Sequence, residues 1–130
     1  MSEQSATLAT RLSDLDSALS RLRDALDQPK SEWTRDAAIK RFEFTFELAW
    51  KSVADAARIQ GLDVSSPRRA WKAALQLGWI DDDLLWLDML ENRNRASHSY
   101  REATAERIYS SLAKYADALM VLLSALRAER

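Results

Sequence analysis

The chain has no cysteine and a single histidine among its 130 residues. The lack of cysteine excludes disulfide bonds and thiolate metal sites. With one histidine, a single chain cannot build a metal site from several imidazole groups either. We therefore expect neither a bound metal nor a cofactor.

Long apolar runs and an excess of charge of one sign are missing as well. No run approaches the roughly 20 apolar residues of a membrane-spanning helix, and residues 1–10 lack the pattern of a signal peptide. The sequence thus predicts a cytoplasmic protein with no membrane association. The 19 Lys and Arg balance 20 Asp and Glu, giving a net charge of −1. Any site for RNA or a nucleotide must therefore be a local basic patch.

Glycine and proline occur only twice each, at Pro29, Gly61, Pro67 and Gly78. These residue types interrupt helices, so the four positions mark the breaks in a chain that otherwise has helical patterning. The length fits one domain. We predict a single all-α domain over residues 1–130, folded as an antiparallel four- to five-helix bundle.

Hydrophobic residues at steps of three and four define the first two helices. The first ends at Pro29 and carries a stripe of six leucines: Leu8, Leu12, Leu15, Leu19, Leu22 and Leu26. The second begins after a cap at Ser31 and extends to about Gln60. Its apolar surface is unusually wide, because Phe44 and Leu48 lie outside the main stripe of Phe42, Phe46, Ala49 and Val53. Such a helix contacts several neighbours or a second subunit, and we expect Trp86 to join that subunit interface.

Three further helices follow. Ser66 and Pro67 start a short one that ends near Gly78. Asp81 or Asp82 caps the next, which continues to the region of Arg95. The sequence from Ser99 to Glu102 matches the Ser-x-x-Glu capping box, so the last helix is predicted to begin at Ser99.

The segment from Asn92 to Arg101 differs from the rest of the chain. It has few apolar residues, contains the only histidine, His98, and holds Arg93, Arg95 and Arg101. On a straight helix Arg93 and Tyr100 share a face, whereas His98 is rotated from Arg93 by about 140°. A break at residues 97–99 could bring His98 back beside Arg93. Arginine, histidine, a phenol and a helix start together suit a phosphate group, although a capping histidine in a solvated helix end is the competing interpretation.

Two other groups have chemical potential. Glu43 and Glu47 lie four residues apart on one helical face and form either a carboxylate pair or an acidic surface that pairs with Arg41, Lys51 or another chain. Five tryptophans could stack on bases, but their helical spacing favours the core: Trp33, Trp50, Trp71, Trp79 and Trp86.

Several boxes resemble the bacterial nucleotidyltransferase substrate-binding-protein family. They are Arg-Phe-Glu-Phe-Thr-Phe-Glu-Leu-Ala-Trp-Lys at 41–51, Ser-Pro-Arg at 66–68, Gly-Trp-Ile-Asp at 78–81 and Trp-Leu-Asp-Met-Leu at 86–90. Arg93-Asn94 and Ser97-His98-Ser99-Tyr100 follow in the same order. The resemblance covers roughly residues 8–126. It extends to the wider HEPN superfamily and to HepT toxins of HepT–MntA toxin–antitoxin pairs, whose Arg-x4-His-x-Tyr signature matches Arg93, His98 and Tyr100.

This resemblance implies a homodimer in which two motifs face each other, and a minimal nucleotidyltransferase as partner. In the HepT-like branch it implies a metal-independent endoribonuclease toxin acting on RNA such as tRNA. The partner silences the toxin by transferring AMP to the motif tyrosine, here Tyr100. Arg93 and His98 are the implied catalytic residues, with Asn94, Ser97, Glu43 and Glu47 in supporting roles.

A mechanism without metal uses the 2′-hydroxyl of the RNA as nucleophile. His98 then acts as general base or acid, and Arg93 stabilises the charge on the phosphorane. AMP on Tyr100 would block the site with a bulky anion. Two alternatives remain at this point: a non-catalytic partner subunit that presents Tyr100 or a bound substrate to the nucleotidyltransferase, and a helical interaction module whose basic segment only caps a helix.

Overall fold

The computed structural model describes residues 2–129, so Met1 and Arg130, the two ends of the predicted domain, lie outside the described residues. That part of the chain is all helical, which confirms the predicted fold class. Its elements are α1 (Glu3–Leu26), α2 (Glu32–Ile59), α3 (Pro67–Gln76), α4 (Leu84–Arg95), the short 3-10 helix η1 (Ala96–His98) and α5 (Glu102–Ala128). None of the helices in this range has the length and apolar character to cross a membrane.

Two predicted helix starts are confirmed by their caps. Ser31 caps α2 by accepting a hydrogen bond from the backbone N–H of Thr34, and the Thr34 hydroxyl completes the capping box. Ser66 caps α3 with a proline directly after it. Gly61 follows α2 with φ of +86°, a left-handed conformation that ends helices and favours glycine.

The cap predicted at Asp81 or Asp82 is wrong. The N-cap of α4 is Asp83, whose side chain forms no capping hydrogen bond within residues 2–129, and Asp82 accepts a hydrogen bond from the backbone N–H of Leu84 at 2.9 Å.

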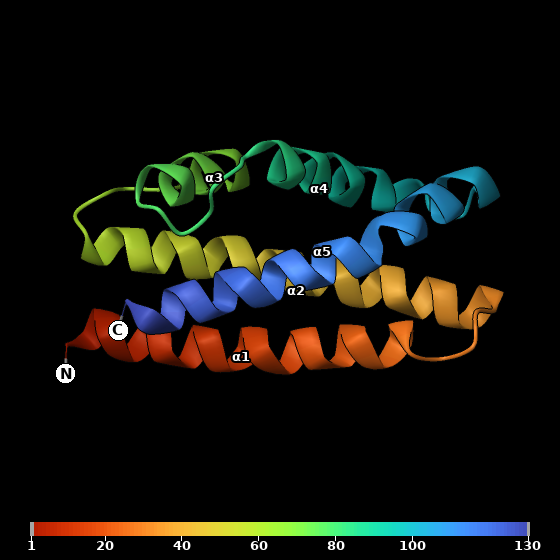
Figure 1. The fold of residues 1–130 in the computed structure, drawn as a ribbon, viewed down its shortest axis with the longest axis horizontal. Helices are drawn as coiled ribbons and strands as arrows, with labels where there is room; N and C mark the ends of the chain where they lie inside the picture. The colour runs from red at the N-terminus through yellow and green to blue at the C-terminus, as the bar shows by residue number, and fades with distance from the viewer. Residues whose placement is uncertain (1, 130) are drawn as a thin grey trace.

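The long helices alternate in direction along the chain, as Figure 1 shows. α1 and α2 form an antiparallel pair, and α5 packs on both of them. α3 and α4 lie end to end on the other side of α2 and together occupy the fourth position of the bundle. The first residues of α1 and the last residues of α5 lie at one end of the bundle, and η1 lies at the opposite end.

The core is the meeting point of the predicted stripes. The first five leucines of α1 are buried and Leu26 is partly buried. From α2, the main stripe of Phe42, Phe46, Ala49 and Val53 is fully buried, and the helix contacts α1, α3 and α5. Phe44 and Leu48, which widen its apolar surface, are half-buried, and Leu48 packs against the core.

The tryptophans divide into buried and exposed ones. Trp71, Trp79 and Trp86 are core residues, as predicted, and Trp50 is half-buried. Trp86 stacks on Trp71 with 4.7 Å between ring centroids and is only 4% exposed, so it is not a surface residue of a subunit interface as expected. The core prediction is wrong for Trp33, which is 87% exposed because it lies in the first turn of α2, outside the packed faces.

Candidate functional site

The candidate site lies where α4 passes into α5. α4 ends at Arg95, η1 covers Ala96–His98, and a short turn leads to Glu102 at the start of α5. The break predicted at residues 97–99 is therefore present. The break lies at the end of the bundle opposite the start of α1 and the end of α5, and the chain reverses direction there (Figure 1).

The predicted helix start at Ser99 is wrong. Ser99 keeps a helical backbone conformation, with φ of −70° and ψ of −7°, and is the C-cap of η1. Arg101 has the extended conformation that an N-cap requires, and α5 begins after it without a side-chain cap. The glutamate that would complete the capping box is used elsewhere, because Glu102 Oε1 accepts a hydrogen bond from Arg35 at 2.5 Å. The positive end of the helix dipole is thus at Glu102 rather than at Ser99.

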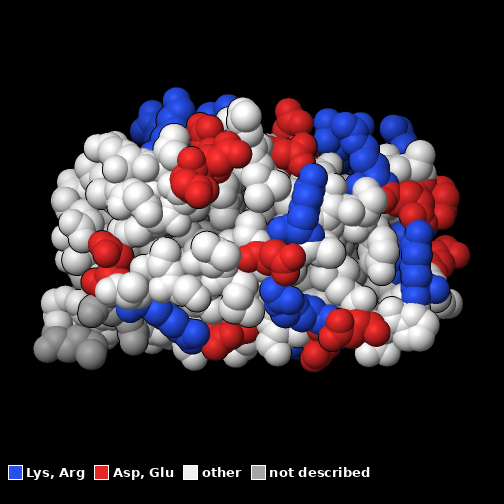
Figure 2. Space-filling view, in the orientation of Figure 1, with Lys and Arg blue, Asp and Glu red and all other residues white. Residues whose placement is uncertain are grey.

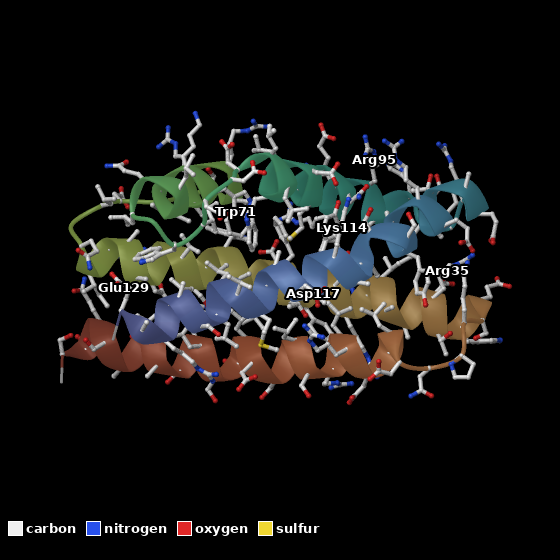
Figure 3. All side chains as sticks on the ribbon, in the orientation of Figure 1. Arg35, Trp71, Arg95, Lys114, Asp117 and Glu129 are labelled. Atoms are coloured by element: carbon white, nitrogen blue, oxygen red, sulfur yellow. The ribbon has the colours of Figure 1, made fainter. Side chains whose placement is uncertain are left out.

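Arg35 anchors the beginning of α5 from α2. Its side chain is only 4% exposed and forms ion pairs with Asp36, Glu102 and Glu106. Hydrogen bonding to Glu102 raises the pKa of Arg35, against the opposing effect of burial. Lys30 also donates to Glu106 at 2.5 Å, and this hydrogen bond is the largest cause that lowers the pKa of Glu106. These contacts fix the position at which the chain leaves the turn after Tyr100 (Figure 3).

Arg93 is held by α2. Its Nη2 donates to Glu47 Oε1, its Nη1 donates to Asn94 Oδ1 at 2.9 Å, and its guanidinium carbon lies 5.1 Å from the centroid of the Phe46 ring. Trp50 Nε1 donates to the same Glu47 carboxylate at 3.0 Å. The structure therefore joins two of the predicted residues, Arg93 and Glu47, across 46 positions of sequence.

The charge of Glu47 follows from these neighbours. Burial acts to raise its pKa, but the hydrogen bonds from Arg93 and Trp50 and the nearby positive charges outweigh burial and lower the pKa. Glu47 also lies 3.9 Å from Lys51, as predicted, whereas Arg41 donates to the backbone oxygen of Arg21 instead. Glu43, the other member of the predicted carboxylate pair, is half-buried, and within residues 2–129 it has no ion-pair partner.

His98 and Tyr100 lie together at the surface. Their ring centroids are 6.1 Å apart in an edge-to-face arrangement, and the guanidinium carbon of Arg101 lies 5.6 Å from the Tyr100 centroid. Tyr100 is 75% exposed. Ser97 Oγ donates to the backbone oxygen of Asn94 at 3.4 Å. Tyr100 is thus an accessible phenol between an imidazole and a guanidinium.

The predicted site residues consequently form two groups. One is Arg93 with Asn94 and Glu47, and the other is His98 with Tyr100 and Arg101. Across the described residues, no hydrogen bond, ion pair or ring contact joins Arg93 to His98. Nor do any three metal-binding side chains of that range cluster to hold a metal ion.

Sequence patterns did not identify a set of hydrogen-bonded polar residues next to the site, of which Tyr115 and Asn92 are buried. Tyr115 Oη donates to Asp88 Oδ2, Asn92 Nδ2 donates to Tyr115 Oη at 2.8 Å, and Arg95 Nη1 donates to Asn92 Oδ1 at 3.1 Å. We call these four residues the polar chain. The sequence did contain one signal for this set. Tyr115 lies in the otherwise aliphatic stripe of the last helix, and a buried hydroxyl requires a hydrogen-bond partner.

The surface around the site carries both signs of charge. Figure 2 shows Lys and Arg gathered along the edge formed by α3 and α4, with Asp and Glu between them. The basic groups near η1 are Arg93, Arg95 and Arg101. Of these, Arg93 is neutralised by Glu47, so the local positive charge comes mainly from the other two.

Comparison with known proteins gives a consistent result. The family described as "Nucleotidyltransferase substrate binding protein like" matches residues 10–128. A crystal structure of the protein ttk003001694 from Thermus thermophilus is 35% identical, covers 87% of this chain and 98% of its own, and superposes with a TM-score of 0.83.

A second structure is HI0074 from Haemophilus influenzae, described as revealing the fold of a substrate-binding domain of a nucleotidyltransferase. It is 25% identical and covers 89% of this chain and 98% of its own, with a TM-score of 0.81. No curated protein matches. Because the family match spans nearly all of the bundle, this chain belongs to the nucleotidyltransferase substrate-binding-protein-like family.

Proposed function

We propose that this chain is a partner subunit of a nucleotidyltransferase and presents Tyr100 as the acceptor of the transferred nucleotide. The family to which the chain belongs supports the partnership. The observation that carries the choice of acceptor is the exposure of Tyr100, which is 75% accessible, whereas Tyr115 is fully buried and Tyr109 is half-buried. An acceptor hydroxyl must enter the active site of another subunit, and only an exposed side chain can do so.

The surroundings of Tyr100 fit this role. The turn that carries it is short and lies between η1 and α5, and Arg35 fixes its exit through Glu102. A fixed acceptor reduces the entropy lost when the reacting groups are aligned. Arg101, beside the Tyr100 ring, and Arg95 on α4 supply positive charge for the phosphates of a nucleoside triphosphate.

The transfer itself is a single displacement at phosphorus. The oxygen of Tyr100 forms a bond to the α-phosphorus of ATP, the bond from that phosphorus to the bridging oxygen breaks, and pyrophosphate leaves. The phenol proton passes to a basic group of the enzyme subunit or to water. The product is a phosphodiester between Tyr100 and AMP.

The direct test incubates the purified chain with Mg²⁺, ATP labelled at the α-phosphate, and each minimal nucleotidyltransferase encoded in the same genome. We expect label on the wild-type chain and none on Tyr100→Phe. Tyr109→Phe is the matched control, because it removes a phenol from α5 outside the motif. Absence of label on the wild type, or label that persists on Tyr100→Phe, contradicts the proposal.

A metal-independent RNase is the second candidate function. The observation that favours it is the exposure of His98 next to Arg95 and Arg101 at one end of the bundle. Because no hydrogen bond, ion pair or ring contact joins Arg93 to His98 within the described residues of one chain, we assign this function to a homodimer in which the two motifs form one composite site.

RNA cleavage distinguishes the two functions. We would incubate the chain, with Tyr100 shown to be unmodified by mass spectrometry, with total RNA and tRNA in EDTA. Cleavage that leaves 2′,3′-cyclic phosphate and is lost in His98→Ala supports the toxin-type RNase. A folded wild-type chain that leaves RNA intact while accepting AMP on Tyr100 supports the partner subunit alone.

A further inference from the structure

The polar chain beneath the site ends at the surface in Arg95. Asn92 is 3% exposed, and both ends of its amide are used, one by Tyr115 and one by Arg95. Tyr115 is fully buried and donates onward to Asp88. Buried amides and hydroxyls are unfavourable in a helical core unless each is hydrogen-bonded, so this set of bonds fixes the orientation of its members.

Arg95 is the exposed end of this arrangement. Its side chain is 35% exposed, and Figure 3 places it at the outer edge of the α4 layer, on the side away from α1. Nη1 is bound to Asn92 and Nη2 lies 3.7 Å from Glu91 Oε2, so within residues 2–129 only one nitrogen of the planar fork has a hydrogen bond. The guanidinium is thus oriented from below before any ligand arrives.

The positive charge of Arg95 is less fully compensated by a carboxylate than that of Arg93. Arg93 is partly buried against Phe46 and bonded to Glu47. Glu91, the one carboxylate that pairs with Arg95 among the described residues, is 3.7 Å away, and its side chain is 64% exposed. Exposed pairs of this kind contribute little, so a phosphate can replace Glu91 at low cost.

The local helix geometry places Arg95 on the same side as His98. Arg95 is the residue directly before η1, and His98 is the last residue of that helix. Side chains three residues apart in a 3-10 helix lie one above the other. His98 is exposed and Arg95 is partly exposed, so both side chains are available to a ligand at this end of the bundle.

We propose that Arg95 binds a phosphate group of the ligand that enters beside His98, and that Asp88, Tyr115 and Asn92 position its guanidinium for this purpose. This inference rests on the proposed function, because it names the group that holds the nucleotide at that same site. Arg95 is a binding residue, and Asp88, Tyr115 and Asn92 are positioning residues.

The test measures binding of two fluorescent probes, an ATP analogue and a 12-nucleotide single-stranded RNA, by anisotropy over a series of salt concentrations. Arg95→Gln should weaken binding roughly tenfold, as expected for loss of one charge-assisted hydrogen bond. For RNA it should also reduce the slope of log K against log salt by roughly one. Arg95→Lys should restore the slope but only part of the affinity, since it lacks the planar fork.

Two further variants test whether the position of the Arg95 guanidinium, and not only its charge or the stability of the fold, determines binding. Tyr115→Phe keeps every charge, so we expect weaker binding with an unchanged salt slope, measured at a temperature where circular dichroism shows the variant folded. Arg127→Gln is the matched control, because it removes the same charge from the opposite end of α5, where Arg127 pairs with Asp16. It should bind both probes like the wild type.

The outcomes are distinct from those of the acceptor assay. Equal affinities and slopes for wild type and Arg95→Gln overturn the role of Arg95, as does a wild-type chain that binds neither probe. Binding of only one probe identifies the source of the phosphate, nucleotide or RNA, and supports the inference if Arg95→Gln weakens it. Failure of AMP transfer to Tyr100, with probe binding intact, overturns the proposed function and leaves Arg95 as a phosphate-binding residue.

Discussion

The hydroxyl of Tyr115 is the group whose removal has the best-defined consequence for stability. Tyr115→Phe leaves the ring in place, stacked on Phe42 with 5.6 Å between centroids. It removes the hydrogen bond to Asp88 and leaves the buried amide of Asn92 without its acceptor. A buried polar group without a partner costs about 1–3 kcal/mol, so we expect a loss of about 2 kcal/mol.

This loss is measurable by urea denaturation and by thermal melting. At about 4 °C per kcal/mol for a domain of this size, the melting temperature should fall by about 8 °C. Tyr109→Phe is the control, because Tyr109 is half-buried on the same helix and its hydroxyl forms no hydrogen bond within residues 2–129. It should change the free energy of unfolding by less than about 0.5 kcal/mol.

The pH dependence gives an independent check on the same hydroxyl. Burial, followed by the hydrogen bond to Asp88, raises the pKa of Tyr115 to about 12. The unfolded chain ionises near the ordinary value of about 10. The stability contributed by the neutral phenol is therefore complete below pH 10 and is lost as the pH rises from about 10 to about 12.

The difference between wild type and Tyr115→Phe should consequently narrow over that alkaline window, because only the wild type has this group to ionise. Equal stabilities of Tyr115→Phe and Tyr109→Phe near pH 7 would refute the argument. So would a difference that stays constant up to pH 12.

Three other substitutions test separate contacts. Arg35→Gln removes the cation that joins Glu102 and Glu106 to α2, so unfolding in urea should become slightly easier and amide exchange faster in the first turn of α5. Exchange that rises evenly along the helix would contradict the anchoring role. Glu47→Gln breaks the ion pair with Arg93. Because the pKa of Glu47 is lowered in the folded chain, the stability that the pair contributes should be present above about pH 4.3 and disappear as the pH falls through the lowered pKa. A difference in stability between wild type and variant that persists at pH 2 would argue against the ion pair. Trp33→Ala should alter the free energy of unfolding by less than about 0.5 kcal/mol, because the side chain is 87% exposed, and a larger loss in calorimetry would mean that another surface covers it.

The helices could be predicted because their signals are local. Leucines at steps of three and four, capping serines and left-handed glycines all act within a few residues. The end of α1 and both ends of α2 and α3 therefore lie close to the predicted positions. Ser99 shows where such signals fail. Its capping box depends on Glu102, but Arg35, 67 positions away in the sequence, donates a hydrogen bond to the Glu102 carboxylate instead. The competing contact exists only in the folded bundle.

The residues of the site were predictable as a segment but not as an arrangement. The unusual composition from Asn92 to Arg101 identified the segment, and family resemblance selected residues within it. Which side chains meet was decided by packing between helices: Glu47 reaches Arg93 across 46 positions, and Tyr115 reaches Asn92 across 23. Helical periodicity assigns a residue to a face of its own helix and contains no information about the neighbour on the other side.

The start of α1 and the end of α5 both lie opposite η1, and this arrangement determines how the chain can be joined to another protein. α5 has 27 residues, so at 1.5 Å per residue about 40 Å separates its last turn from the motif turn. A tag or surface attachment on either end therefore leaves Tyr100 and Arg95 accessible, which makes immobilised binding assays practical. Conversely, the active site of a nucleotidyltransferase fused to either end would have to reach across about 40 Å to Tyr100, through the width of the enzyme itself, an extended linker of about 11 residues, or both.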